Sequence, residues 1–395
     1  MTDGITKRKY QETHPWITFS FNANHLNYNI WLLLGEAQSK FEHIKGAPLL
    51  PNTIQNMLLV YLAKGALATT AIEGNTLTER EVEKRIRGQL DLPLSKEYLG
   101  QEIDNIVEAY NLIGRRLLDS EFPDKLSVKQ IKEYNLLVLK GLPLSEDVIP
   151  GELRTYSVGV ASYRGAPPED CEYLLDKYAT WLNDEFTYPP DQRVIYGILK
   201  AIMAHLYFVW IHPFGDGNGR TARLIEFQIL LSVGAPQIAA HLLSNHYNQT
   251  RTEYYRNLEV TSKSGGDVSG FVLYALQGFV DGLREEIKYI QSQQIIVHWI
   301  NHIHNSFRGK NSKADERKKQ LMLEISKIGP KELTIEEIHY GTPLIAEMYA
   351  NLSIRTMSRD IDELVEMKLL NKVHDKYSSN LASLTAYMVP VRVME

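Results

Sequence analysis

Apolar side chains recur at intervals of three and four residues along almost the whole chain, and this helical period limits the folds open to it. The segment from Thr53 to Thr70 follows the pattern, and Gly74 and Asn75 just beyond it are typical of a helix end. The same period predicts further helices at 17–48, 79–89, 96–119, 127–140, 169–186, 191–210, 220–233, 250–260 and 268–305. The sequence therefore predicts a mainly α fold.

Composition narrows the class of protein. The 395 residues have a formal net charge of −5, which argues against a protein that binds nucleic acid over its whole surface. The single cysteine, Cys171, excludes an intramolecular disulfide, fits a reducing compartment, and is expected in the core. The most apolar stretch, Val194–Phe214, contains Lys200 and two histidines, so we expect a buried helix and not a membrane span. With no signal peptide at the N-terminus, we expect a cytoplasmic, multidomain protein without membrane contact.

One region interrupts the helical pattern. Between 150 and 168, short β-branched alternation is bounded by glycine and proline. This pattern is typical of a small β-hairpin, although a plain surface connection fits the period equally well.

The composition changes after His304. Residues 308–331 are polar and basic, so we expect a linker that leads into a helix, and a domain boundary near residue 308. Beyond it the pattern predicts three short helices followed by two strands, at Thr334–Tyr340, Pro343–Tyr349, Ser353–Met367, Leu369–Lys376 and Leu384–Val393. That order is typical of a winged helix-turn-helix domain.

The role of this C-terminal domain is open between DNA and protein binding. Arg355, Ser358 and Arg359 have the spacing of a recognition helix. However, residues 306–395 hold 14 basic and 13 acidic side chains, without the basic excess that a phosphate-binding domain usually has. Protein binding or dimerisation is therefore the favoured use, and DNA binding is the weaker expectation.

A short segment between two predicted helices, Ile211–Arg223, has an unusual concentration of glycine and charge. Three alternate glycines at a helix start expose backbone N–H groups at the positive end of the helix dipole, which is an arrangement that binds anions. Arg220 and Arg223 lie three residues apart on the next helix, so they share one face and can clamp adjacent phosphates.

Two more side chains in this segment suit polyphosphate chemistry. Asp216 can hold Mg²⁺ against a diphosphate, because Mg²⁺ prefers hard oxygen ligands. His212 can accept a proton near neutral pH. We therefore expect a nucleotidyl- or phosphoryl-transfer site in which His212 deprotonates a hydroxyl nucleophile. A zinc site built from His205, His212 and Asp216 is an alternative, but a packed core histidine is the favoured role of His205.

Residues 212–223 resemble the complete motif of the Fic family, His-Pro-Phe-x-Asp/Glu-Gly-Asn-Gly-x-x-x-Arg with Arg also at the ninth position. The resemblance extends over roughly 50–305 and implies an all-α core. It implies transfer of AMP from ATP to a Ser, Thr or Tyr hydroxyl of a target protein, with His212 as base and Asp216 as Mg²⁺ ligand. Gly219 favours AMP transfer, because phosphorylating relatives carry Lys there. The resemblance implies that nucleotide is bound by Glu73, His212, Gly217, Asn218, Gly219, Arg220, Thr221, Arg223 and Tyr255.

A second resemblance lies upstream. Thr69–Asn75 is similar to the family's inhibitory-helix pattern, Ser/Thr-x-x-x-Glu-Gly/Asn, within a helix at about 54–75. A carboxylate at this helix end can pair with an arginine. The resemblance implies that Glu73 pairs with Arg223, excludes the γ-phosphate and inhibits transfer. Related enzymes use the same glutamate to remove AMP, so hydrolysis is an alternative activity.

Two weaker matches concern the substrates. The 150–168 hairpin stands where the family has its flap, which docks the target protein by β-augmentation. Tyr255 resembles the adenine-side residue, with ordinary helix packing as the alternative for it and for Tyr254. Ser262 stands where some relatives carry Asn.

These observations predict three regions: an N-terminal helical region at 1–120, a Fic core at 121–305, and a linker with a winged-helix domain at 306–395. The leading function is protein adenylyl transfer. The alternatives are phosphoryl transfer or AMP removal at the same site, and an ATP-sensing regulator that binds DNA. The oligomeric state, monomer or homodimer, is open.

Overall fold

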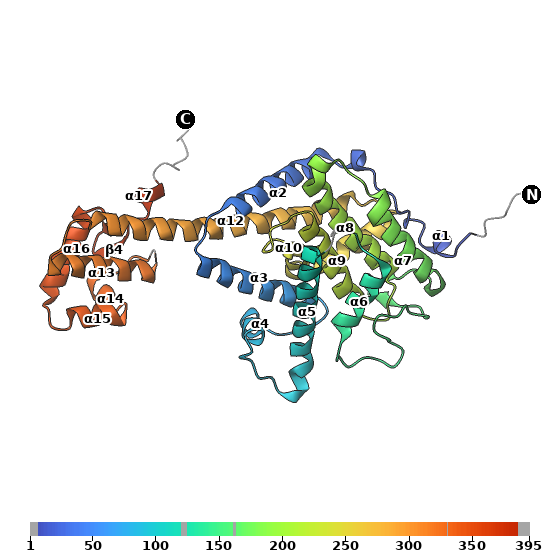
Figure 1. Cartoon of the computed structure of the whole chain (residues 1–395), viewed down its shortest axis with the longest axis horizontal. Coiled ribbons are helices and arrows are strands. Elements are labelled where there is room, and N and C mark those ends of the chain that lie inside the picture. Colours follow the sequence, from blue (N-terminus) through green and yellow to red (C-terminus); the bar gives the residue numbers. More distant parts are fainter. Residues whose placement is uncertain (1–6, 120–124, 161–162, 330, 386–395) are drawn as a thin grey trace, which may run out of the picture. The chain divides into compact units, whose positions relative to one another are not determined.

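The computed structural model describes residues 7–119, 125–160, 163–329 and 331–385. The chain forms two compact units, Met1–Ile287 (unit 1) and Lys288–Glu395 (unit 2) (Figure 1). The helices of unit 1 are α1 (Tyr10–Thr13), α2 (Tyr28–Gly46), α3 (Pro51–Ala71), α4 (Glu79–Ile86), α5 (Glu97–Asp119), α6 (Val128–Leu139), α7 (Cys171–Thr180), α8 (Arg193–Ile211), α9 (Asn218–Ser232), α10 (Leu242–Gln249) and α11 (Arg251–Lys263). The long helix α12 (Ser269–Ser306) begins in unit 1 and ends in unit 2.

Local sequence explains where several helices begin. Pro51 occupies the first turn of α3, where a missing N–H costs nothing. Thr78 and Ser127 begin α4 and α6 with capping boxes, in which each hydroxyl accepts from a backbone N–H and a Glu or Gln side chain returns the bond. These caps fix where α4 and α6 begin.

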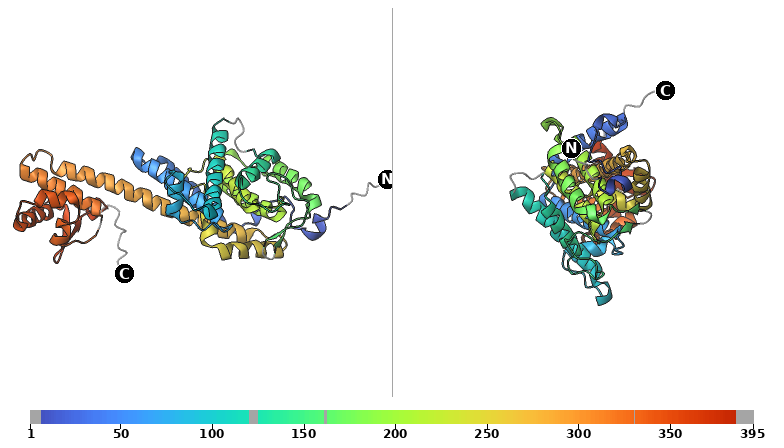
Figure 2. Two further views of the ribbon diagram at one scale, coloured as in Figure 1. Left: turned by 90° about the horizontal axis from the view of Figure 1, so that it is seen from below. Right: turned by 90° about the vertical axis from the view of Figure 1, so that its right-hand side faces the viewer.

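The pair α8 and α9 forms the centre of unit 1 (Figures 1 and 2). Helix α8 packs against α2 and α7, and α9 packs against α3, α5 and α6. The segment Pro190–Ile211 is long and apolar enough to cross a membrane, but 83% of its most apolar window is buried inside the protein. This agrees with the predicted core helix, and Cys171 is buried as expected.

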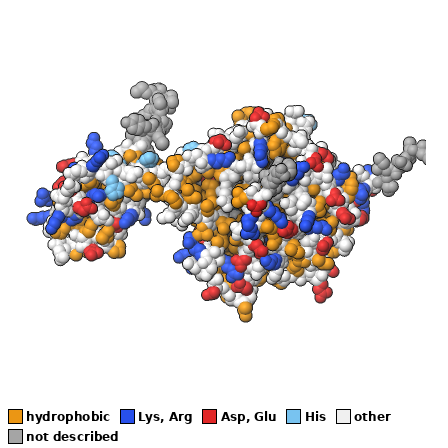
Figure 3. Space-filling model, viewed as in Figure 1, with side chains coloured by type: hydrophobic (Ala, Val, Ile, Leu, Met, Phe, Trp, Pro, Cys, Tyr) orange, Lys and Arg blue, Asp and Glu red, His pale blue; other side chains and the backbone are white. Residues whose placement is uncertain are grey.

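The outside of unit 1 has no single-sign patch on the face drawn in Figure 3. Acidic and basic side chains are interspersed there among apolar ones. This mixture fits the small net charge of the whole chain.

The hairpin predicted within 150–168 is present. Strands β1 (Gly159–Val160) and β2 (Tyr163–Arg164) are antiparallel, with Gly159 opposite Arg164 and Val160 opposite Tyr163. A further bridge joins Leu153 to Phe214, so the base of the hairpin pairs with the 211–223 segment.

Unit 2 contains α13 (Lys313–Ile328), α14 (Ile335–His339), α15 (Pro343–Tyr349), α16 (Ile354–Glu366) and the hairpin β3 (Leu370–Val373) with β4 (Lys376–Ser379), followed by α17 (Ala382–Thr385). Its core joins Trp299 and Ile303 of α12 to Leu321 and Ile325 of α13. The predicted order of three short helices and two strands is therefore present.

Four predictions differ in detail, and one helix was not predicted. Residues 308–331 are mostly helix α13, because its apolar face, including Met322, is buried in unit 2. The second strand was expected at Leu384–Val393, but β4 lies earlier, Leu384 is in α17, and 386–393 lie outside the described residues. The apolar face at 17–48 is helical only from Tyr28, and α10 has no counterpart in the prediction. The boundary expected near 308 falls inside unit 2, since the end of α12 contributes to that core.

Candidate active site

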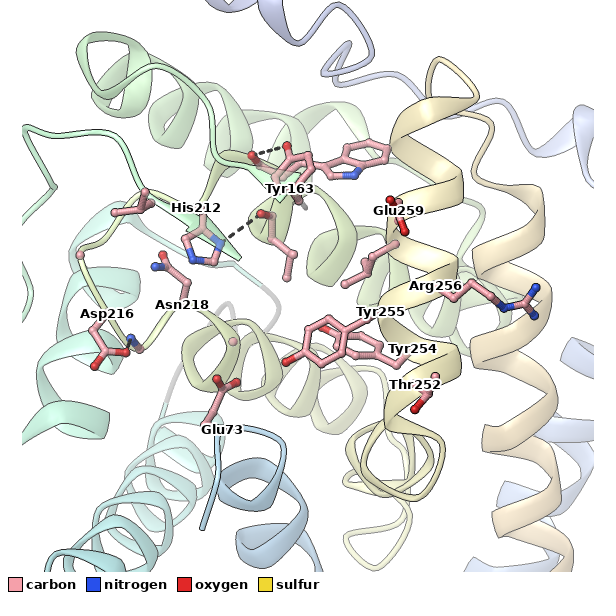
Figure 4. Close-up of a pocket in the computed structure, with 18 residues that line it drawn as sticks. Glu73, Tyr163, His212, Asp216, Asn218, Thr252, Tyr254, Tyr255, Arg256 and Glu259 are labelled. Carbon is pink, nitrogen blue, oxygen red and sulfur yellow. Dashed lines mark hydrogen bonds between the residues drawn. The ribbon is translucent and has the colours of Figure 1, made fainter. Parts of the chain in front are cut away.

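A cavity of about 580 Å³ opens at the α8–α9 turn (Figure 4). The turn, the hairpin, α11 and the residues after α3 all line it. Its lining residues are Glu73, Val158, Gly159, Tyr163, Val209, Trp210, His212, Gly215, Asp216, Gly217, Asn218, Gly219, Thr252, Tyr254, Tyr255, Arg256, Leu258 and Glu259.

His212 ends α8 in a left-handed conformation, with φ 50° and ψ 59°. This backbone region is unfavourable for a residue with a side chain, so surrounding contacts must hold it there. The backbone N–H of His212 donates to the Phe208 carbonyl at 2.9 Å, and Nδ1 lies 3.3 Å from the Val209 carbonyl. Burial lowers the pKa of His212 to about 4, with the charge of Arg154 contributing. The ring is therefore neutral at pH 7 and able to accept a proton.

Arg154 ties the hairpin to the end of α8. Its side chain is 4% exposed and donates to four backbone carbonyls: His212 at 2.7 Å, Tyr156 at 2.7 Å, Ala166 at 2.5 Å and Ile211 at 3.4 Å. These carbonyls flank both strands of the hairpin and the left-handed residue. A single guanidinium thus fixes the His212 backbone and the base of the hairpin together.

The turn between α8 and α9 is held by two asparagines. Asn218 donates to the Phe214 carbonyl at 2.8 Å and accepts from the Phe214 N–H at 3.0 Å. Asn135 of α6 donates to the Asp216 carbonyl at 2.8 Å and accepts from the Gly151 N–H at 2.9 Å. The turn therefore has a fixed shape before any ligand binds.

The start of α9 faces the cavity and suits an anion. Gly217 precedes the helix at φ 75°, a backbone conformation that favours glycine, and Gly219 lies in the first turn. The first N–H groups of a helix have no partner within the helix, so they are available to a phosphate. A Cβ at Gly219 would lie only 2.2 Å from Oε1 of Glu73, so that carboxylate lies directly over the helix start.

Arg220 lies beneath this surface and is 5% exposed. Its Nη2 donates to Oδ1 of Asp216 at 3.1 Å, and its Nη1 donates to Oε1 of Glu102 at 2.9 Å. Asp216 itself is about half exposed at the mouth of the turn. Its Oδ1 also accepts from the Gly217 N–H at 2.5 Å.

Arg223 pairs with Glu73. The Nη2 atom of Arg223 donates both to Glu73 Oε1 at 2.5 Å and to the Thr69 carbonyl at 2.8 Å. Burial would raise the pKa of Glu73, but the charges of Arg223 and Arg220 outweigh it and lower that pKa. Glu73 is therefore ionised at neutral pH. The Nε and Nη1 atoms of Arg223 are buried without a partner among the described residues.

Two tyrosines of α11, Tyr254 and Tyr255, line the cavity on the same side as Glu73 (Figure 4). Tyr254 is 2% exposed, and its hydroxyl bonds to Nε2 of His205 at 2.8 Å. His205 Nδ1 lies 3.2 Å from Glu226. His205 is thus a buried core histidine with Nε2 bonded to Tyr254, and no zinc-type cluster occurs in the part of the chain that the structure describes.

The structure brings most of the predicted site residues to one cavity. His212, Asp216–Gly219, Glu73 and Tyr255 line it. Arg220 and Arg223 are buried behind the lining, and Thr221 points into the core, with its hydroxyl 3.5 Å from Asn135. The roles of Glu102, Asn135, Arg154 and Tyr163 were not predicted from the sequence. Glu102 and Asn135 lie among other polar residues of α5 and α6, so no local pattern marks them.

Comparison with known sequences identifies the central part of the chain. Residues 125–230 match the Fic/DOC family. Protein adenylyltransferase fic-1 of Caenorhabditis elegans is 30% identical over 239 residues, which are 60% of this chain and 43% of that protein. Protein adenylyltransferase Fic of Nematostella vectensis is 28% identical over 207 residues, 52% of this chain and 44% of that protein. The chain thus spans less than half the length of these curated relatives.

Solved structures agree with the fold. A Fic family protein from Desulfovibrio desulfuricans G20 superposes with a TM-score of 0.54 at 20% identity, covering 89% of this chain and 95% of that one. Fic-1 (residues 134–508) from C. elegans superposes with a TM-score of 0.50 at 26% identity, covering 65% of this chain and 70% of that one.

Proposed function

Because the chain carries a Fic/DOC domain, we propose that it is a protein adenylyltransferase, which moves AMP from ATP to a Ser, Thr or Tyr hydroxyl of a target protein. One observation carries the proposal: a neutral His212 and the anion-binding start of α9 line the same cavity. The names of the related proteins support the same reaction.

In the proposed reaction, the target hydroxyl and the nucleotide meet at His212. The imidazole takes the hydroxyl proton while the hydroxyl oxygen bonds to the α-phosphorus. The bond from that phosphorus to its bridging oxygen breaks, and pyrophosphate leaves. Gly217, Asn218 and Gly219 bind the phosphates through the start of α9, while Arg220 and Arg223 balance the charge from below. The aromatic rings of Tyr254 and Tyr255 form a wall for the adenine.

The donors present fit a magnesium ion. Asp216 is an exposed carboxylate beside the phosphate-binding turn, and Mg²⁺ in nucleotide sites is commonly held by one or two carboxylates together with substrate phosphates. When bound, the ion would offset phosphate charge. Its binding would require Arg220 to share Asp216 Oδ1.

Autoinhibition is part of the proposal. Glu73 occupies Nη2 of Arg223 and lies over Gly219, so it stands where the end of a triphosphate would lie. An ionised carboxylate there both repels the phosphate and occupies its guanidinium partner. We expect ATP to bind productively once this side chain is removed.

The 150–168 hairpin is the proposed docking site for the target. Val158, Gly159 and Tyr163 line the cavity beside His212. A short strand pair can bind an extended peptide through its backbone, which requires little of the target's sequence. The tyrosine hydroxyl donates to the Trp210 carbonyl at 2.8 Å and so holds the hairpin against α8.

Unit 2 is proposed to be a winged helix that binds a protein and not DNA. Residues 332–353 hold four glutamates and no Lys or Arg. A cavity of about 470 Å³ beside them is lined by Tyr340, Leu352 and Ile354, which are 72%, 40% and 64% exposed. The segment 332–353 offers no basic side chain to DNA phosphates, and its exposed apolar residues fit a protein partner; Arg355 and Arg359 follow it on α16. A gel shift of random duplex DNA by the full chain at physiological salt would contradict this proposal.

Two labelled nucleotides test the reaction. The Glu73→Gly chain is incubated with α-³²P-ATP and, separately, with γ-³²P-ATP. The inactive control is the same chain carrying His212→Ala as a second substitution, in parallel reactions. We expect α-label on protein, found by mass spectrometry as AMP on a hydroxyl. Label from the γ-phosphate would indicate phosphorylation. Loss of α-label from modified protein after addition of the parent chain, which retains Glu73, would indicate AMP removal. No label from either nucleotide would refute transfer.

A further inference from the structure

Arg220 is fixed between two carboxylates from different parts of the chain. Its Nη1 donates to Glu102 of α5 and its Nη2 donates to Asp216 of the turn, while its Nε is buried without a partner among the described residues. A guanidinium has five N–H donors, so two bonds leave three unused among the described residues. The pair with Glu102 therefore holds Arg220 in place and leaves some of its N–H donors unused.

Glu102 is itself held from the other side. Its side chain is 13% exposed, Oε1 accepts from Arg220, and Oε2 accepts from Nδ2 of Asn75 at 2.9 Å. Burial raises the pKa of Glu102, and the carboxylates of Glu73 and Asp216 add to the rise. With both oxygens bonded, the carboxylate has one orientation.

Asn75 connects this arrangement to the turn after α3. Its Nδ2 also donates to the Leu99 carbonyl at 2.9 Å, and its Oδ1 accepts from the Leu77 N–H at 3.1 Å. Its backbone N–H donates to the Thr70 carbonyl at 3.2 Å. Only a side-chain amide can donate twice and accept once in this way, so neither aspartate nor leucine would replace it.

The turn at 73–75 thus reaches both arginines of α9. Glu73 contacts Arg223 directly, and Asn75 reaches Arg220 through Glu102. Resting on the proposed function, we propose that Glu102 is a positioning residue that presents Arg220 to the nucleotide, and that Asn75 holds Glu102 in the required orientation. The same turn therefore both blocks the site and supports it.

This double role restricts how inhibition can be lifted. If the whole turn moved away from the domain, Glu73 would release Arg223. Asn75 would then also release Glu102, and Arg220 would no longer be held in position by that carboxylate. Relief of inhibition must therefore move the Glu73 side chain while Asn75 stays docked. An activating signal acts on one carboxylate and not on helix α3 as a whole.

The test measures ATP binding, which does not depend on any target. Isothermal titration of the Glu73→Gly chain with ATP gives the reference Kd. Asn75→Ala in that background keeps every charge and removes the hydrogen bond that orients Glu102. We expect the Kd for ATP to rise about tenfold, because Arg220 is then less well preorganised. Glu102→Gln should raise the Kd for ATP by a similar factor, even though it removes a carboxylate that repels the phosphates. Glu108→Gln is the matched control, because Glu108 lies on the same helix in an exposed pair with Lys140, and Kd should not change.

A double-mutant cycle separates positioning from general damage. In an Arg220→Ala background, Asn75→Ala should leave Kd unchanged, because the positioned group is gone. An increase that persists there would overturn the proposal, and so would an unchanged or lower Kd in the first comparison. If Asn75→Ala does not fold, as judged by its urea midpoint, Glu102→Gln carries the same cycle. Failure of the Glu73→Gly chain to bind ATP at all would instead refute the proposed function.

The regulatory part has its own readout. Asn75→Ala alone, with Glu73 present, should not increase label transfer from α-³²P-ATP, whereas Glu73→Gly should increase it. An increase in both variants would show that undocking the turn is sufficient for activation, and would overturn this part of the proposal.

Discussion

The two segments that meet at His212 differ in how firmly they are held. The turn between α8 and α9 is fixed by both asparagines, by Arg154 and by its own helix ends. The hairpin has strands of two residues each and is attached through Arg154 and the Tyr163 hydroxyl. This difference fits the proposed function, in which a preorganised element performs the chemistry and an adaptable one docks the target.

The largest effect should come from His212→Ala, in the preorganised element. In the Glu73→Gly background, kcat should fall by about 10²–10⁴-fold, the usual contribution of a general base. The KM for the target protein should change little, because the hairpin is intact. Steady-state transfer kinetics measure both, and a mainly KM effect would break the distinction between the two segments.

Arg154→Met should damage both segments at once. Four carbonyls lose a charged donor in a buried place, which should lower the free energy of unfolding by about 2–5 kcal/mol. Urea unfolding checks the loss. Arg164→Met is the control on the same hairpin, since Arg164 is exposed, and it should unfold within about 0.5 kcal/mol of the parent. Equal losses in both variants would show that Arg154 is an ordinary surface residue of the hairpin.

Tyr163→Phe should affect the hairpin alone. It removes one hydrogen bond to α8, worth about 1 kcal/mol, so the KM for the target should rise about fivefold while kcat is kept. Tyr98→Phe, at an exposed tyrosine of α5, should leave both constants unchanged. A fall in kcat with KM unchanged would mean that the hairpin also positions His212.

The smallest change is expected from mild acid. Since the pKa of His212 is lowered to about 4, the ring stays neutral as pH falls from 7 to 5 and protonates only below that range. We expect kcat/KM to fall by no more than about a tenth over those two units, whereas an unshifted imidazole would lose about 25-fold. A pH profile of the Glu73→Gly chain decides between them, provided its fluorescence confirms that it stays folded at pH 5.

The sequence predicted the turn between α8 and α9 far better than the residues from other segments that hold this turn in place. The residues of the α8–α9 turn are contiguous, so their spacing alone indicates a phosphate site. Glu102, Asn135 and Arg154 come from three other segments, and each is a single polar residue whose partner lies far away in the chain. No local period encodes such a pairing.

For the fold too, long local patterns were predicted well and short ones were not. Long helices with a buried stripe were predicted because their period repeats over several turns. Helix α10 (Leu242–Gln249) was missed because its short polar sequence lacks that repeat. The second strand of unit 2 was placed too late because the apolar run after 384 outweighed the short strand Lys376–Ser379, where only alternate residues are buried.

The glycine beneath the Glu73 carboxylate links two positions that are far apart in the sequence. A Cβ at position 219 would collide with that carboxylate in its present place. A side chain introduced at position 219 would therefore have to displace Glu73 and disturb its pair with Arg223. The identity of residue 219 thus controls whether this ion pair can form in its present geometry.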